Sequence, residues 1–175
     1  MAQDHRIPVE LVLFAKNIRF ARQNAKLRQV DVTSLCGIAQ DFLSRLERLE
    51  TGVGLETMTR LSRVLTIPLC DLLQPDFAKS YSLAITSRRW ANYKELFEAE
   101  EPPFFELKLF AENFKRARID ANLTIADVEE LSGYQVSDIS ITEKGEQSTQ
   151  LITMARMAAA VQVPLKILLT PNKEI

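Results

Sequence analysis

The chain has 175 residues, of which 46% are hydrophobic and 26% charged, a composition typical of a globular protein. No stretch approaches the roughly 18 apolar residues of a membrane span, and the first ten residues do not have the order of a signal peptide, so we expect a cytoplasmic protein. The net charge of −1 excludes binding of nucleic acid through an overall basic field, so any such site must be local.

Five helices are predicted in the first part of the chain. The first follows from apolar residues at three- and four-residue steps, which are Leu11, Phe14, Ile18, Ala21 and Ala25. Shorter helices are expected over residues 29–36, 40–48, 55–65 and 68–73, the last with a proline in its first turn. No segment alternates with period two, so the predicted fold class is all-α.

Residues 76–104 are predicted to be a helical linker. A helix from about residue 84 to residue 99 would place an aromatic stripe on one face, which comprises Trp90, Tyr93 and Phe97. This stripe either packs on the rest of the chain or forms a dimer interface, since large aromatic side chains are typical interface anchors. The sequence leaves both alternatives open.

The remainder of the chain repeats the first part. Residues 11–75 and 107–171 align at a constant offset of 96 without a gap, with 25 identities in 65 positions. Two copies of one helical unit are therefore predicted. A unit of about 65 residues buries only about 60% of its unfolded surface, so we expect the copies to pack together or to dimerise.

The second and third predicted helices form a helix-turn-helix pattern. Gly37 separates them and is expected to supply the positive φ that ends the first of the two. Ile38 and Leu43 are expected to fill the angle between the helices. A glycine between two helices is by itself weak evidence for a helix-turn-helix motif. The spacing of the surrounding residues makes the assignment specific.

The spacing of Leu27, Gln29, Gly37 and Glu47 resembles that of the Cro/CI-type (XRE) helix-turn-helix superfamily of phage repressors and bacterial regulators. The resemblance covers residues 11–75 and 107–171. It implies two tandem five-helix, lambda-repressor-like domains, a DNA-reading one at 9–75 and a degenerate one at 105–175. The second copy departs from the pattern by having Ile125 where glutamine is usual. The resemblance also implies a bacterial or phage-encoded protein that is nucleoid-associated when bound.

In helix-turn-helix proteins the second helix lies in the major groove, and its first residues face the base edges. The residues predicted to read bases are Gln40, Asp41, Ser44 and Arg45. Glutamine can pair with adenine and arginine with guanine through two hydrogen bonds. Asp41 either accepts from cytosine or only stabilises the helix N-terminus.

Phosphate contacts are expected around this helix. The resemblance implies that Gln29 clamps a phosphate, and Arg28, Lys26, Arg48 and Thr51 are candidates for further contacts. For Lys26 and Arg48 a phosphate contact and a solvated surface charge without a DNA contact are equally expected. The resemblance also implies two partly buried ion pairs, Arg22 with Glu47 and Arg118 with Glu143, to which we assign a structural role.

The second copy offers little for base recognition. Its positions equivalent to the base-reading residues include Val136, Ser137 and Ile141, and Glu129 and Glu130 would face phosphates. Residues 9–75 hold nine basic and seven acidic side chains, whereas 105–171 hold seven and nine. We therefore predict that the first copy binds DNA and that the second serves packing or oligomerisation.

A transcription regulator, in particular a repressor, is the predicted function, with a homodimer binding a palindromic operator in double-stranded DNA. One alternative is an antitoxin-like protein whose second domain binds a partner protein while the first represses its own operon. Another is a monomer whose two copies imitate a dimer on an asymmetric site. The only histidine, His5, has no nucleophile beside it, and Cys36 and Cys70 are too few for a metal site, so we expect no enzyme, cofactor or metal.

Overall fold

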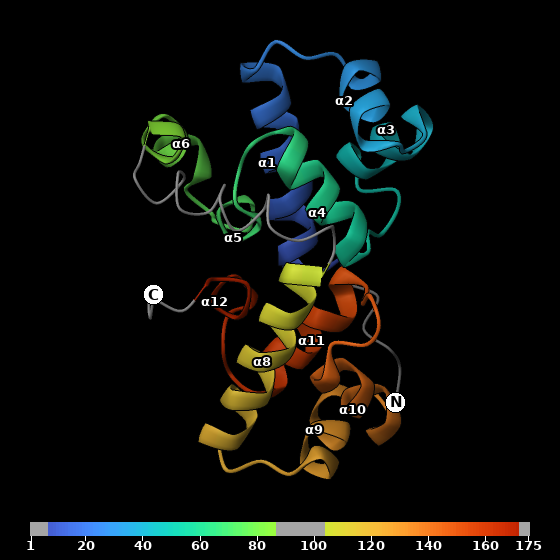
Figure 1. The fold of residues 1–175 in the computed structure, drawn as a ribbon, viewed down its shortest axis with the longest axis vertical. Helices are drawn as coiled ribbons and strands as arrows, with labels where there is room; N and C mark the ends of the chain where they lie inside the picture. Colours follow the sequence, from blue (N-terminus) through green and yellow to red (C-terminus); the bar gives the residue numbers. More distant parts are fainter. Residues whose placement is uncertain (1–6, 87–103, 172–175) are drawn as a thin grey trace.

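The computed structural model describes residues 7–86 and 104–171, and in these two stretches the chain is all-α, as the sequence predicts. They contain no β-strand and a single isolated bridge, between Gly54 and Gln150. Figure 1 shows the helices in two groups, one formed by the first stretch and one by the second. We call residues 9–75 the first unit and residues 105–171 the second unit.

The helices of the first unit start at the predicted residues or within two positions of them. They are α1 (Val9–Asn24), α2 (Gln29–Cys36), α3 (Gln40–Glu47), α4 (Leu55–Val64) and α5 (Leu69–Leu72). Gly37 ends α2 with a φ of +67°, a conformation that costs glycine no steric strain. Phe14 and Ile18 of α1, Leu46 of α3 and Leu61 of α4 are almost completely buried and form the centre of the unit.

An additional helix, not predicted from the sequence, follows the first unit. The predicted helix from about residue 84 to residue 99 lies almost entirely outside the described residues, whereas α6 spans Phe77–Thr86. Its first residue, Phe77, is fully buried and meets the ring of Phe20 on α1 edge-on, at a centroid distance of 6.0 Å. Burial of Phe77 on α1 therefore starts the helix directly after Pro75 and Asp76. The predicted stripe residues Trp90, Tyr93 and Phe97 lie outside the described residues.

The second unit repeats the order of the first. Its helices are α8 (Phe104–Asp120), α9 (Ile125–Ser132), α10 (Val136–Lys144), α11 (Leu151–Ala160) and α12 (Leu165–Leu168). The last four start 96 residues after α2, α3, α4 and α5. At the start of α9 the Asp127 N–H donates to the Thr124 hydroxyl at 3.1 Å, and the Thr124 N–H donates to the Asp127 carboxylate at 2.7 Å. This reciprocal cap satisfies two backbone donors that the helix itself leaves unpaired.

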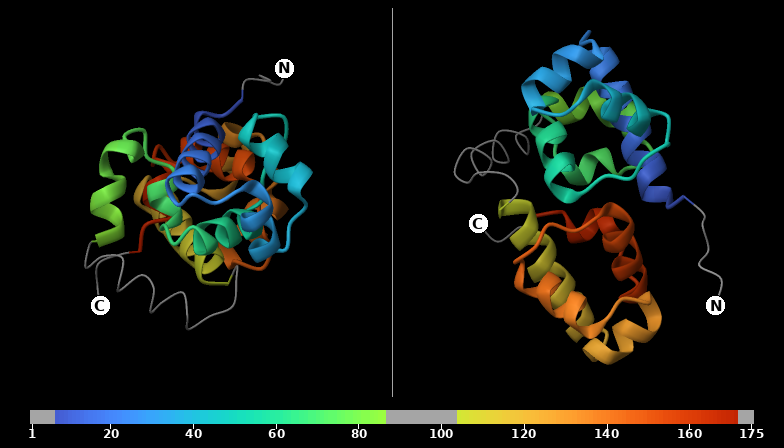
Figure 2. Two further views of the ribbon diagram at one scale, coloured as in Figure 1. Left: turned by 90° about the horizontal axis from the view of Figure 1, so that it is seen from above. Right: turned by 90° about the vertical axis from the view of Figure 1, so that its right-hand side faces the viewer.

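The two units pack against each other through equivalent surfaces. Contacts join α1 to α11, α8 to α4, and α5 to α12, and each of these has its counterpart at the offset of 96. The Leu55 N–H donates to the Thr149 carbonyl and the Leu151 N–H to the Val53 carbonyl, both at 2.9 Å. These two bonds are also equivalent to each other. The units are therefore related by an approximate two-fold axis near the Gly54–Gln150 bridge, as in a symmetric dimer (Figure 2).

One ion pair breaks this symmetry. Arg63 on α4 lies 3.5 Å from the carboxylate of Glu106 on α8, and the Glu106 side chain is completely buried. The equivalent positions on the other side of the axis are Ala159 and Glu10, so the pair occurs once. A symmetric pairing of two second units would bury Glu106 opposite an alanine, which is strongly unfavourable for a charged group. The ion pair thus disfavours a pairing of two second units relative to the pairing of a first unit with a second.

Candidate nucleic-acid interface

The α2–α3 pair presents one face of α3 to solvent. Leu43 and Leu46 of α3 are buried in the core of the first unit, whereas Gln40, Asp41 and Arg45 are exposed. This division follows from the helical period, which places the two leucines on one side and the polar residues on the other. Figure 1 shows that α3 lies at the outer edge of the molecule.

Three of the four residues predicted to read bases therefore share an exposed face. The side chains of Arg45 and Asp41 are 48% and 76% exposed, with a guanidinium–carboxylate distance of 3.8 Å. An exposed pair of this kind contributes at most about 1 kcal/mol, so either side chain can leave it for another partner. Ser44 is half-buried, and its hydroxyl accepts a hydrogen bond from Arg48 at 2.8 Å.

The residues predicted to contact phosphate differ in orientation. The Gln29 amide donates inward to Glu47 at 2.9 Å, which leaves its oxygen and the start of α2 for an outside partner. The Arg28 guanidinium donates to Asp31 and lowers the pKa of that carboxyl. Lys26 is exposed, next to α2.

The loop after α3 holds the other two candidates. Arg48 pairs with Glu50 at 2.8 Å, and this pair is about half exposed. Thr51 is half-buried and lines a cavity between the two units. The carboxylates of Asp31, which is half-buried, and Glu50, which is exposed, thus neutralise Arg28 and Arg48 in the free protein. A phosphate that displaced them would lose little, because exposed pairs are weak.

Two buried ion pairs tie the first helix of each unit to its third. Arg22 donates to both carboxylate oxygens of Glu47, at 2.7 and 2.8 Å, and Arg118 donates to Glu143 at 2.5 and 3.1 Å. Each arginine also donates to a backbone carbonyl in the loop that follows its own helix, that of Leu27 or Leu123. Glu47 has Gln29 as a further donor, whereas the second unit has Ile125 at that position. The pairs hold α3 and α10 at a set angle to α1 and α8.

The corresponding surface of the second unit is acidic. Residues 28–50 contain three basic and four acidic side chains, whereas the equivalent residues 124–146 contain one and six. Glu129, Glu130 and Asp138 are exposed, and so is Val136, which stands where the first unit has Gln40. In Figure 1 the α2–α3 and α9–α10 pairs lie on the same side of the molecule, one above the other. A duplex along that side would meet a polar surface at α3 and an acidic one at α10.

Sequence reasoning missed the cavity between the units, which is lined by Tyr134 and Arg156 among others. An alignment of the two units does indicate one difference at this cavity. Arg60 and Arg156 are equivalent, but the residue four positions earlier is Glu56 in the first unit and Ile152 in the second. The second arginine has thus lost an acidic neighbour.

Other chemistry is not seen in the described residues. In residues 7–86 and 104–171 no group of histidine, cysteine and acidic side chains is arranged to hold a metal ion. No helix in the same stretches combines the length and the apolarity that crossing a bilayer requires. Cys36 and Cys70 are buried and not linked by a disulfide, and burial raises the pKa of the Cys36 thiol to about 11.

Comparison with known proteins gives one informative relative. The chain is 36% identical over 67 residues to an uncharacterized HTH-type transcriptional regulator, y4dJ, of Sinorhizobium fredii. The match covers 38% of this chain and 87% of the relative, so nearly all of the relative corresponds to part of this chain. No model of a known protein family matches the chain, and no solved structure matches it.

Proposed function

Because this chain belongs to the HTH-type transcriptional regulators, we propose that it is a sequence-specific repressor of the Cro/CI (XRE) type, acting on double-stranded DNA in the cytoplasm. In this proposal residues 9–75 are the DNA-reading domain and residues 105–175 a second, degenerate domain of the same kind. The observation that carries it is the exposed polar face of α3, whose equivalent on α10 has lost its long polar side chains. The protein then acts by binding alone, without catalysis or cofactor.

Recognition in this proposal uses direct contacts from α3 to base edges. With α3 in the major groove, Gln40 at its first turn can pair with adenine, and Arg45 can donate two hydrogen bonds to guanine. Arg45 must first leave Asp41, which is inexpensive because their pair is exposed. Asp41 then either accepts from cytosine or remains beside the helix N-terminus.

Phosphate contacts would set the position of α3. The start of α2 with Gln29, and the charges of Arg28, Lys26 and Arg48, flank α3 on the surface of the first unit. Each cation that replaces its carboxylate partner by a phosphate releases counterions from the duplex. DNA affinity is therefore expected to fall with salt concentration, in proportion to the number of such contacts.

The approximate two-fold axis bears on stoichiometry. A single chain already has two helix pairs on one side of the molecule, arranged as in a symmetric dimer. The acidic α9–α10 pair would be repelled by phosphate, however, so we propose the homodimer on a palindrome, in which each chain supplies one α3 and a further interface joins the chains. Mass measurement of the protein–DNA complex decides between one and two chains per duplex.

The acidic α9–α10 surface favours a second candidate function. Exposed Glu129, Glu130 and Asp138 suit a basic protein surface better than a phosphate backbone. In that antitoxin-like role the second domain would bind a partner protein while α3 binds the operator. Co-purification of a basic partner protein with the wild type, and its loss in the double variant Glu129→Lys with Glu130→Lys, would support the antitoxin-like role.

Selection of bound sequences from random duplex DNA tests the main proposal. We expect Gln40→Ala and Arg45→Ala to weaken binding by about 1–3 kcal/mol each and to relax selection at one base pair each. The matched controls are Val136→Ala and Ile141→Ala at the equivalent positions of the second unit, which should leave selection unchanged. Absence of any sequence preference in the wild type, or equal effects of both sets of variants, would contradict the proposal.

A further inference from the structure

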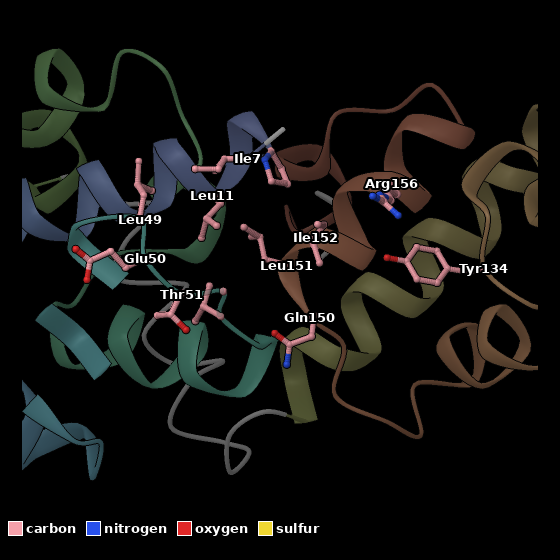
Figure 3. Close-up of a pocket in the computed structure, with 13 residues that line it drawn as sticks. Ile7, Leu11, Leu49, Glu50, Thr51, Tyr134, Gln150, Leu151, Ile152 and Arg156 are labelled. Atoms are coloured by element: carbon pink, nitrogen blue, oxygen red, sulfur yellow. The ribbon is translucent and has the colours of Figure 1, made fainter. Parts of the chain in front are cut away.

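A cavity of about 540 Å³ opens between the two units, beside the Gly54–Gln150 bridge. Its volume lies in the range of about 300–1,000 Å³ that is typical of small-molecule sites. The first unit contributes Leu11 of α1 and the segment 49–53 after α3, and the second unit contributes α11 and Tyr134. A ligand here would contact both units and the segment that leads from α3 to α4 (Figure 3).

The second-unit end of the cavity holds an arginine that has lost its acidic neighbour. In the first unit the Arg60 guanidinium pairs with Glu56 at 2.5 Å, one helical turn earlier. The second unit keeps the arginine as Arg156 but has Ile152 in place of the glutamate. Arg156 is half-buried, and no ion pair or hydrogen bond of its side chain is found within residues 7–86 and 104–171. Because arginine stays charged, the cavity presents a permanent cation at this end.

A tyrosine lies beside that cation. Tyr134 stands where the first unit has Ile38, and its ring packs on the core while its hydroxyl is directed toward Arg156 and Ile152 (Figure 3). A phenol hydroxyl and a guanidinium together supply donors that suit a carboxylate. The differences between the two units therefore place a phenol and an arginine without an acidic neighbour in the same cavity, on one side of the approximate two-fold axis.

The rest of the cavity is mixed, with an apolar middle beside the polar side chains of Gln150 and Thr51. Leu11, Leu151 and Ile152 line the middle, and Glu50 marks the first-unit end (Figure 3). The Glu50 carboxylate is held by Arg48 at 2.8 Å. Because that pair compensates its own charge, the first-unit end offers no further cation among the described lining residues, and the cavity provides for one negative charge only.

We propose that this cavity is a binding site for a small monocarboxylate with an aliphatic or aromatic body. The ligand carboxylate accepts hydrogen bonds from the Arg156 guanidinium and the Tyr134 hydroxyl, and its apolar body covers Leu151 and Ile152. In the first unit the Glu56 carboxylate plays the part of this ligand toward Arg60. The site does not depend on the proposed DNA binding.

Calorimetric titration of the full chain, without DNA, tests the site with octanoate and phenylbutyrate as probes and octanol as the uncharged control. We expect saturable binding of one carboxylate per chain and binding of octanol at least tenfold weaker. Arg156→Met should weaken carboxylate binding at least tenfold, because it removes the cation and keeps the length of the side chain. Arg60→Met in the first unit is the matched control and should leave the affinity unchanged.

A second variant supplies the carboxylate from the chain itself. Ile152→Glu restores in the second unit the pair that Glu56 and Arg60 form in the first, and it should abolish binding of the probes while the helix content stays the same. The site is overturned if neither carboxylate binds the wild type saturably. It is equally overturned if Arg156→Met and Ile152→Glu, both folded, bind octanoate as tightly as the wild type does.

Discussion

Substitution of Glu47 by glutamine tests the role of the ion pair behind α3. The Glu47 side chain is 4% exposed and the Arg22 side chain 12%, and both carboxylate oxygens accept from the guanidinium. In Glu47→Gln one of the two accepting oxygens becomes an amide N–H group and the other loses its charge, which leaves the buried charge of Arg22 without a counter-charge. Breaking a buried pair in this way costs about 3–5 kcal/mol.

The lower end of that range applies here. Arg22 keeps its bond to the Leu27 carbonyl at 3.0 Å and is not wholly removed from water. We therefore expect a loss of about 3 kcal/mol in the free energy of unfolding, on the order of a hundredfold in the folding equilibrium. Glu143→Gln should lower the free energy of unfolding by less than Glu47→Gln does. Glu47 also accepts a hydrogen bond from Gln29, whereas the second unit has Ile125 at that position, so Glu143 has one donor fewer to lose.

Urea unfolding followed by circular dichroism measures the loss, and fluorescence anisotropy with a selected duplex measures DNA affinity on samples that are fully folded. The double variant Arg22→Met with Glu47→Met should recover much of the stability, since replacing both charges removes the unpaired one. An unchanged urea midpoint together with weaker DNA binding would refute the reasoning. It would mean that Glu47 acts at the DNA instead of holding α3.

Further outcomes follow from single groups. Hydrogen bonds from the Thr124 hydroxyl and then the Thr124 N–H lower the pKa of Asp127. The charged form of Asp127 therefore contributes to stability above the ordinary pKa of a carboxyl, and this contribution is lost as the pH falls through the lowered pKa. In Asp127→Asn the urea midpoint should accordingly depend less on pH below about pH 4. Thr66 is exposed with a φ of +56°, a conformation unfavourable for a β-branched residue, so Thr66→Asn should raise the free energy of unfolding by about 1 kcal/mol in the same urea assay. Cys36 is 5% exposed and its pKa is raised to about 11, so iodoacetamide should alkylate it much more slowly in the native protein than in urea, as mass spectrometry would show. If the protein binds DNA as proposed, saturating octanoate should change the affinity of the wild type for its duplex, because octanoate and DNA would both contact the segment around α3. The affinity of Arg156→Met for the same duplex should not respond to octanoate.

Local features were predictable where their physical cause is local. The starts of α2, α3 and α4 follow from apolar spacing, and the left-handed turn at Gly37 follows from the absence of a side chain. The start of α6 was not predictable in this way. It depends on the contact of Phe77 with Phe20, and these residues are far apart in the sequence.

The same holds for the candidate interface. Periodicity alone indicates that Gln40 and Arg45 share a face opposite Leu43 and Leu46, because a helix of this length allows only one core-facing side. It does not indicate that Gln29 donates to Glu47, since that bond depends on the angle between α2 and α3. Nor does it show that carboxylates neutralise Arg28 and Arg48.

The sequence by itself determined the all-α class, the similarity of residues 11–75 to residues 107–171 and the polar face of α3, since each can be read from neighbours along one helix or from an alignment of the chain with itself. Tertiary structure alone decided how the two copies meet. The approximate two-fold axis, the single Arg63–Glu106 pair and the cavity at Arg156 all join residues from different copies. Their relative positions depend on how two complete surfaces fit together, and no periodicity within one helix carries that information.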